Sequence, residues 1–267
     1  TIVIVLIIIA AFTMIETLQW INTTFLPKTP KLILLAIYVT LCILLVMTSL
    51  QTIVIVNVFV LLAVVVFGFF VAFTNLQVKD HELLRPFLEH GFQPILSGLI
   101  YPASGFSELI MFLLIQHQIK DRLRWYHFAI MLLILAGLTL GPLIGAITEF
   151  GPAEAAKQRY PAYEEWGLVT IGRYVEHLDF LSIYQWLTGT FIRVGFILYV
   201  VTDLLGMVGD HQRILKMVAL PFFFICLPLI LLNQRKLYIN SYVYFLFLTI
   251  HFFNDCGFHV RKKSKQV

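Results

Sequence analysis

Charged residues are scarce in this chain. Only 13% of its 267 residues are Asp, Glu, Lys or Arg, whereas 60% are hydrophobic, and the mean hydropathy is +0.88. A soluble domain of this length needs more polar surface to cover its core, so the composition excludes an ordinary soluble protein. The sequence instead predicts an all-α polytopic membrane protein, because helices satisfy their own backbone hydrogen bonds in lipid.

Several signatures of chemistry are missing as well. Three cysteines provide no disulfide framework, and no group of His, Cys, Asp or Glu has the spacing of metal ligands. The sequence contains neither a phosphate-binding loop nor a convincing nucleophile–base pair. The net charge of +4 comes from loop lysines and arginines rather than from a basic face. We therefore expect no enzymatic activity, no cofactor and no nucleic-acid partner.

Apolar stretches dominate what is present, and they predict a single transmembrane domain over residues 1–267 with eight spans. The predicted spans are residues 1–21, 32–48, 52–74, 92–115, 125–149, 181–204, 214–233 and 239–255. The chain begins inside an apolar run and not with methionine, and it shows no signal-peptide pattern. We therefore expect the natural protein to extend further at its N-terminus.

The distribution of Lys and Arg over the loops predicts the orientation of the chain. On one side, positive charge gathers in the short loops at 120–124 and 213–216 and in the tail at 261–265. The longer segments on the other side, 75–91 and 150–180, are rich in acids. Because short, positively charged loops stay in the cytoplasm, we expect both termini of this chain to be cytoplasmic.

Segment 150–180 is then an extracytoplasmic loop. Its first half has a loop-like composition, whereas the second half predicts an interfacial helix with Val169, Tyr174, Leu178 and Leu181 on one face. Both a site for a partner protein and a plain connector fit this segment.

The predicted span 92–115 is interrupted in its middle by the sequence YPASGFSE. Pro102 has no N–H to donate, Gly105 accepts backbone angles that other residues resist, and the Ser104 hydroxyl can bond a freed backbone group. Glu108 follows directly. Irregular backbone at membrane depth survives only where protein buries it or where it lines a wet cavity, so this pattern favours a binding site at a broken helix. A proline kink that serves packing alone is the alternative.

A polar stripe runs along the first span. Thr13, Glu16, Thr17 and Trp20 have the spacing i, i+3, i+4 and i+7, which puts them on one helix face. An ionisable residue on such a stripe is costly in lipid, so we expect this face to meet another helix or a ligand.

Arg193 lies near the centre of the sixth predicted span, where Gly189 and Thr190 share its face. Small residues let another helix or a ligand approach closely. An arginine at this depth needs a partner, and Glu108 and Glu16 are the candidates. A structural ion pair and a ligand or proton site both fit these residues.

Three passages resemble a known family. They are FLPKTPK at 25–31, HGFQPILSG at 90–98 followed by YPASGFSE, and YPAYEEWGLVTIGRYVEHLDFLSIYQWLTGTFIRVGFILY at 160–199. In these passages, and along essentially its whole length, the chain resembles the permease-like B subunits (GerAB type) of bacterial spore germinant receptors, within the amino acid–polyamine–organocation superfamily.

The resemblance implies a LeuT-like fold of ten helices in a 5+5 inverted repeat, of which this chain lacks the first two. A five-span repeat would also place the counterpart of the broken span two helices before residue 1. Carried onto this sequence, the resemblance implies a germinant pocket whose residues come from three stretches. They are Thr13, Glu16, Thr17, Tyr101, Ser104, Gly105, Phe106, Glu108, Gly189, Thr190 and Arg193.

The resemblance also implies a role. Such subunits bind small nutrients, mainly amino acids, in the spore inner membrane and act with an A-type subunit and a lipoprotein C-type subunit. A proton- or ion-coupled amino acid transporter of the same superfamily is the alternative, with Glu108, Glu16 and His251 as proton carriers. A structural scaffold inside a larger complex is a third hypothesis.

Overall fold

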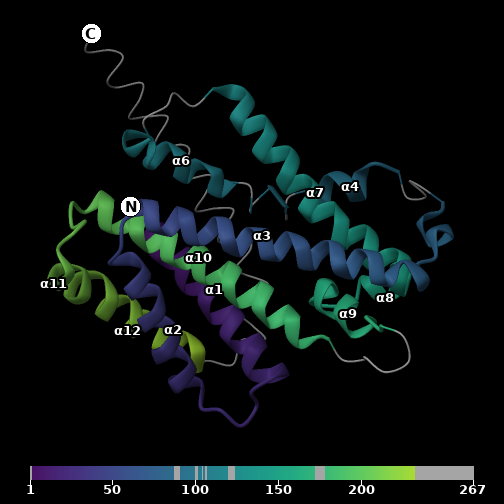
Figure 1. Cartoon of the computed structure of the whole chain (residues 1–267), viewed down its shortest axis with the longest axis horizontal. Helices are drawn as coiled ribbons and strands as arrows, with labels where there is room; N and C mark the ends of the chain where they lie inside the picture. Colours follow the sequence, from purple (N-terminus) through teal and green to yellow (C-terminus); the bar gives the residue numbers. More distant parts are fainter. Residues whose placement is uncertain are drawn as a thin grey trace. The chain divides into compact units, whose positions relative to one another are not determined.

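The computed structural model describes residues 2–86, 91–99, 102–103, 105, 107–119, 124–171 and 178–231. Within these residues the chain is overwhelmingly helical (Figure 1). The longer helices are α1 (Ile2–Thr24), α2 (Lys31–Val46), α3 (Leu50–Thr74), α7 (Trp125–Phe150), α10 (Phe180–Leu204) and α12 (Leu220–Leu231). The shorter ones are α4 (Gln93–Gly98), α6 (Met111–Leu114), α8 (Pro152–Ala155), α9 (Pro161–Gly167) and α11 (His211–Ile214).

Five of the described helical stretches are long and apolar enough to cross a bilayer. They are Ile2–Thr24, Leu50–Gln77, Trp125–Phe150, Phe180–Leu204 and His211–Leu231, the last including the π-helical turn η5 (Leu215–Ala219). Each coincides with a predicted span, so apolar helices of membrane length are confirmed at these five places. Helix α2 coincides with the predicted span 32–48 but has only 16 residues, about 24 Å of rise. The predicted span 239–255 lies outside the described residues, so the count of eight stays a prediction.

The described residues of the predicted span 92–115 form several short helical segments. Helix α4 has six residues and α6 has four, and the 3₁₀ turn η3 (Ser107–Ile110) precedes α6. Pro102, Ala103 and Gly105, at the predicted break between these pieces, are themselves helical. Glu108 lies in the 3₁₀ turn η3, which leads directly into α6, so a break within YPASGFSE stays a prediction.

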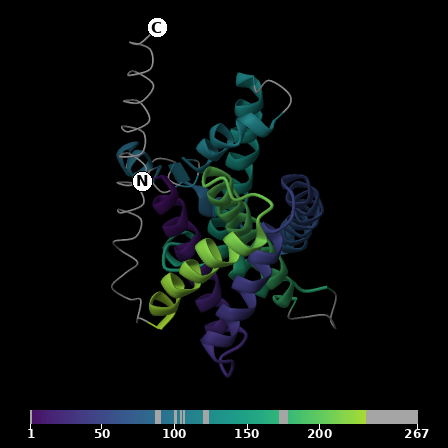
Figure 2. The ribbon, with the colours of Figure 1, turned by 90° about the vertical axis from the view of Figure 1, so that its left-hand side faces the viewer.

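The chain divides into two compact units. The first unit consists of residues 1–54, 103–115 and 190–267 as far as they are described. Within it α1 packs against α2 and α12, and α2 packs against α12 (Figure 2). Met14, Leu35 and Phe222, one from each of these helices, are fully buried and form part of its core.

The second unit consists of residues 55–102 and 116–189. The segments α8, α9 and η2 (His81–Leu84) each pack against α7. A hydrophobic cluster joins α9 to α3, because Trp166 and Val169 pack against Val71. Phe67, Phe70, Leu178 and Leu181 complete this cluster.

The structure corrects part of the interpretation of segment 150–180. Its first half, expected to be loop, carries α8 and α9. Residues 168–171, expected to begin the interfacial helix, are not helical, and residues 172–177 with Tyr174 lie outside the described residues. Prolines at the first positions of α8 and α9 explain these helices, because proline suits the first turn, where no N–H partner exists. Val169, Leu178 and Leu181 belong to one hydrophobic cluster, but Val169 lies outside any helix, so a common helix face is not what brings them together.

Candidate functional site

An ion pair joins the broken span to α10 inside the first unit. Nε of Arg193 donates to Oε2 of Glu108 at 3.0 Å, and Nη2 donates to Oε1 of the same carboxylate. This two-point contact is the strongest form of an arginine–carboxylate bond, because the planar donors match both oxygens. Glu108 is one of the two partners that the sequence offered Arg193.

The Arg193–Glu108 ion pair is partly exposed. The side chain of Arg193 is 43% exposed and that of Glu108 is 16% exposed. A guanidinium near the middle of an apolar helix is costly against hydrocarbon, so its exposed part requires water or a polar ligand. Guanidinium has five N–H donors, of which Glu108 occupies two. This edge of the pair can therefore interact with a further acceptor.

A hydrogen bond between two threonines joins α1 to α10 one turn from this pair. Oγ1 of Thr17 lies 2.9 Å from Oγ1 of Thr190, and both residues are buried. Thr17 also donates to the carbonyl oxygen of Thr13 at 3.0 Å. Thr190 and Arg193 are three residues apart, about 4.5 Å along the helix axis. The polar stripe of α1 therefore meets the face of α10 that carries Arg193.

The other predicted site residues divide into described and undescribed ones. Glu16 is half-buried on the same stretch of α1 as Thr13 and Thr17. A Cβ built on Gly189 or on Gly105 would meet no atom within 4 Å, so both positions border open space. Tyr101, Ser104, Phe106 and His251 lie outside the described residues. The structure thus brings together Thr13, Thr17 and Thr190, and separately pairs Glu108 with Arg193.

A second polar cluster, in the second unit, was missed by the sequence analysis. Nδ2 of Asn75 donates to Oε2 of Glu149 at 3.0 Å and to the backbone oxygen of Glu165 at 2.8 Å. Nζ of Lys79 lies 3.5 Å from Oε1 of Glu149. Glu149 is the one acid in the apolar run 125–150, and that isolated charge was the signal available in the sequence.

Charged and polar groups at these places do not assemble into a metal centre. Over the part of the chain that the structure describes, no three His, Cys, Asp or Glu residues come together in a way that could hold a metal ion. The Arg193–Glu108 pair instead presents one positive and one negative group side by side.

Comparison with known proteins identifies the family. A family model described as spore germination protein matches residues 1–236. Spore germination protein XB of Bacillus anthracis is 43% identical over 228 residues, which cover 85% of this chain and 64% of that relative. The chain therefore spans less than two thirds of the length of this relative, and no solved structure matches it. The resemblance seen in the sequence is confirmed, and the chain belongs to the spore germination protein family of permease-like membrane proteins.

Proposed function

We propose that this chain forms most of the permease-like subunit of a spore nutrient-germinant receptor and binds a small germinant, such as an amino acid, at its broken helix. Family membership and the apolar helices support a permease-like role in germination. The observation that carries the binding site is the partly exposed Arg193–Glu108 pair directly after the break.

The chemistry of the pair suits a zwitterion. Arg193 presents planar donors that fit a carboxylate, and Glu108 presents a carboxylate that accepts from an ammonium group. An amino acid carries both complementary charges on one carbon atom. When such a ligand enters, its carboxylate takes the place of Glu108 at the guanidinium and its ammonium takes the place of Arg193 at Glu108, so no charge is left without a partner.

This exchange also provides a signal. Without ligand the direct ion pair holds the η3 turn against α10, whereas the ligand needs the two side chains apart. The ligand therefore binds the separated state better and shifts the population toward it. We propose that A-type and lipoprotein C-type subunits in the spore inner membrane read this shift, and that both termini of this chain face the cytoplasm, as its loop charges predict.

Ligand-induced thermal stabilisation of the full-length protein in detergent, measured with a panel of amino acids, tests the binding site. We expect at least one amino acid to raise the melting temperature of the wild type, because a ligand stabilises the state it binds. Glu108→Gln should abolish the shift. Glu154→Gln removes the carboxylate of an exposed pair with Lys157 and should leave the shift intact.

Two analogues of the amino acid found in this way test the zwitterion itself. The amine without the carboxyl group and the acid without the amino group should each stabilise the wild type less than the amino acid does. No shift with any amino acid, or an equal shift in wild type and Glu108→Gln, would contradict the proposed site.

Uptake of the radiolabelled amino acid into proteoliposomes then separates a receptor from a transporter. Binding without uptake supports the receptor hypothesis. Uptake driven by a proton or ion gradient would support the transporter hypothesis instead. If substitutions at both Glu108 and Arg193 leave the nutrient response of spores unchanged, the subunit is a scaffold.

A further inference from the structure

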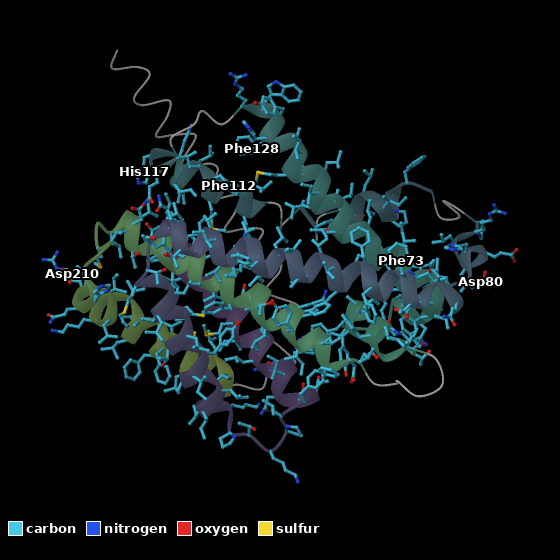
Figure 3. All side chains as sticks on the ribbon, viewed as in Figure 1. Phe73, Asp80, Phe112, His117, Phe128 and Asp210 are labelled. Carbon is cyan, nitrogen blue, oxygen red and sulfur yellow. The ribbon has the colours of Figure 1, made fainter. Side chains whose placement is uncertain are left out.

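A buried polar cluster lies in the second unit where the end of α3, the end of α7 and helix α9 meet. We call Asn75, Lys79, Glu149 and Glu165 the carboxylate cluster. Phe73 and Asp80, labelled in Figure 3, mark the end of α3 from which Asn75 and Lys79 come. The backbone N–H of Asp80 donates to the carbonyl oxygen of Thr148 at 2.9 Å, which ties this end of α3 to α7.

Helix α7 is shaped to receive the side chain of Glu165. A Cβ built on Gly145 would lie 2.9 Å from Oε1 and 3.1 Å from Oε2 of Glu165, so any larger residue would collide with the carboxyl group. Gly145 lies one turn before Glu149 on the same helix. The two carboxyl groups therefore approach the same stretch of α7, and Asn75 links the carboxyl group of Glu149 to the backbone oxygen of Glu165.

The charges inside the cluster do not balance. The Glu149 side chain is 0% exposed, Glu165 is 7% exposed and the Lys79 side chain is 12% exposed. Two carboxylates and one ammonium leave one buried negative charge if both acids are ionised. Two carboxylates that share a buried site do not both ionise readily, because desolvation and mutual repulsion disfavour the second charge.

The hydrogen bonds of the cluster are also incomplete. Among the described residues, Oδ1 of Asn75, Oε1 of Glu149 and Oε1 of Glu165 are buried and have no hydrogen-bond partner. All three are acceptors. Nζ of Lys79 approaches one of them, Oε1 of Glu149, at 3.5 Å, so what the cluster lacks is a further donor. A single proton on Glu165 would supply that donor and would at the same time cancel the excess negative charge.

We propose that Glu165 and Glu149 form a proton-binding site, in which a proton taken from water resides on Glu165 and its O–H donates to a neighbouring unpartnered oxygen. The proton removes one carboxylate charge and converts an acceptor into a donor. It thereby holds α9 against the ends of α3 and α7. Release of the proton leaves two buried carboxylates facing each other and weakens this packing.

The pKa of Glu165 agrees with this site. Burial raises it from 4.5 to about 8, with the charge of Glu149 as the second cause, while Lys79 and the backbone N–H of Ala146 lower it. Other charged or titratable groups lie on the elements packed around the cluster. They are Tyr163 and Glu164 of α9, Asp80, His81 and Glu82 around η2, and Glu154 and Lys157 around α8.

Protonation of Glu165 has a mechanical consequence because α9 carries the neighbouring Trp166. Nε1 of Trp166 donates to Oε1 of Gln185 at 2.9 Å, and Nε2 of Gln185 donates to the backbone oxygen of Val64 at 3.0 Å. Trp166 also packs against Phe67 and Phe70. A proton at Glu165 therefore stabilises contacts of α9 with both α3 and α10 inside the second unit.

Infrared spectroscopy of the full-length protein, titrated from pH 5 to pH 10, tests the proposal directly. We expect a protonated carboxyl band that disappears with a midpoint near pH 8 and that is absent in Glu165→Gln. Glu164→Gln is the matched control, because Glu164 is the adjacent acid of α9 and is exposed. The band should survive in that variant. A wild-type spectrum without the band, or a band that persists in Glu165→Gln, overturns the proposal.

Two further measurements cover the case in which Glu165→Gln does not fold. Glu149→Gln keeps the proton on Glu165 but removes the repelling charge, so the midpoint should move to lower pH. In the wild type, stability should fall as pH rises from about 5 to about 8 and then level off, because over that window only the folded state holds the proton. If the stability instead follows the sodium or potassium concentration and not pH, a cation fills the site. That outcome would overturn the proposed proton site.

Discussion

Gly195 of α10 lies against Leu45 of α2 so closely that a Cβ on the glycine would stand 2.6 Å from Cδ2 of the leucine. This contact lies two residues beyond Arg193 on α10. It therefore sets how closely α10 approaches α2 within the first unit, and with it the place of the guanidinium that pairs with Glu108.

Gly195→Val tests this contact. We expect a loss of about 1–3 kcal/mol in the free energy of unfolding, because a branched side chain overpacks a tight helix contact. Gly195→Ala should cost less, since the tip of Leu45 can turn away. Gly68→Val on α3, where a Cβ meets open space, is the control and should change the melting temperature little. An equal loss in the Gly68 and Gly195 variants would show that the close approach is not what matters.

The hydrogen bond between Thr17 and Thr190 is suited to a double-mutant cycle. Each single Thr→Val change removes one partner, so the buried hydroxyl of the other threonine loses this bond. We expect each change to lower the free energy of unfolding by about 1–3 kcal/mol. The double variant should cost clearly less than the sum of the two, because neither hydroxyl then remains. Thr139→Val, at an exposed position of α7, serves as the control. Strict additivity in chemical or thermal unfolding would argue against a direct bond.

Glu108→Gln should impair the nutrient response of spores more than Asp203→Asn does. The charged bond from Glu108 to a ligand ammonium contributes about 1.5–3 kcal/mol, so about a tenfold or greater rise in the effective germinant concentration is expected. Dose–response curves of germinating spores measure this rise. Similar curves for the two variants would count against a site beside the break.

Exchange of the two charges distinguishes a structural pair from a binding pair. The combined change Glu108→Arg with Arg193→Glu preserves an ion pair between the same two positions. It should restore thermal stability relative to either single reversal, yet it should not restore germinant binding, because the site's charges are then inverted. Recovery of both properties would show that the pair serves stability alone.

Gly145→Ala should destabilise the second unit. The added methyl group would stand within 3.1 Å of three atoms of the Glu165 carboxyl group, which is buried and has little room to move. We expect a loss of about 1–3 kcal/mol in the free energy of unfolding. Gly141→Ala, one turn earlier on α7 with open space at its Cβ, should be neutral or slightly stabilising. A neutral Gly145→Ala would mean that Glu165 does not lie against α7.

Features that depend on local sequence were predictable. An uninterrupted apolar run of membrane length indicates a span wherever it lies, so five predicted spans agree with the helices of the structure. The break predicted in 92–115 was also argued from local residues, but Pro102 and Gly105 are helical in the structure, so that break stays a prediction. Family membership could be inferred for a similar reason, since short passages of sequence carried it before any contact was known.

Contacts between distant residues were decided by the tertiary structure. The sequence offered Arg193 two partners, and the packing of the first unit brings Glu108, which is 85 residues away, into contact with it. The carboxylate cluster was missed because Asn75 meets Glu149 and Glu165 across 74 and 90 residues. Helical periodicity states which face of a helix carries a polar group, but the neighbour of that face depends on how the helices pack. The sequence by itself therefore determined the membrane class, the long apolar helices and the family, whereas only the tertiary structure decided which charges meet.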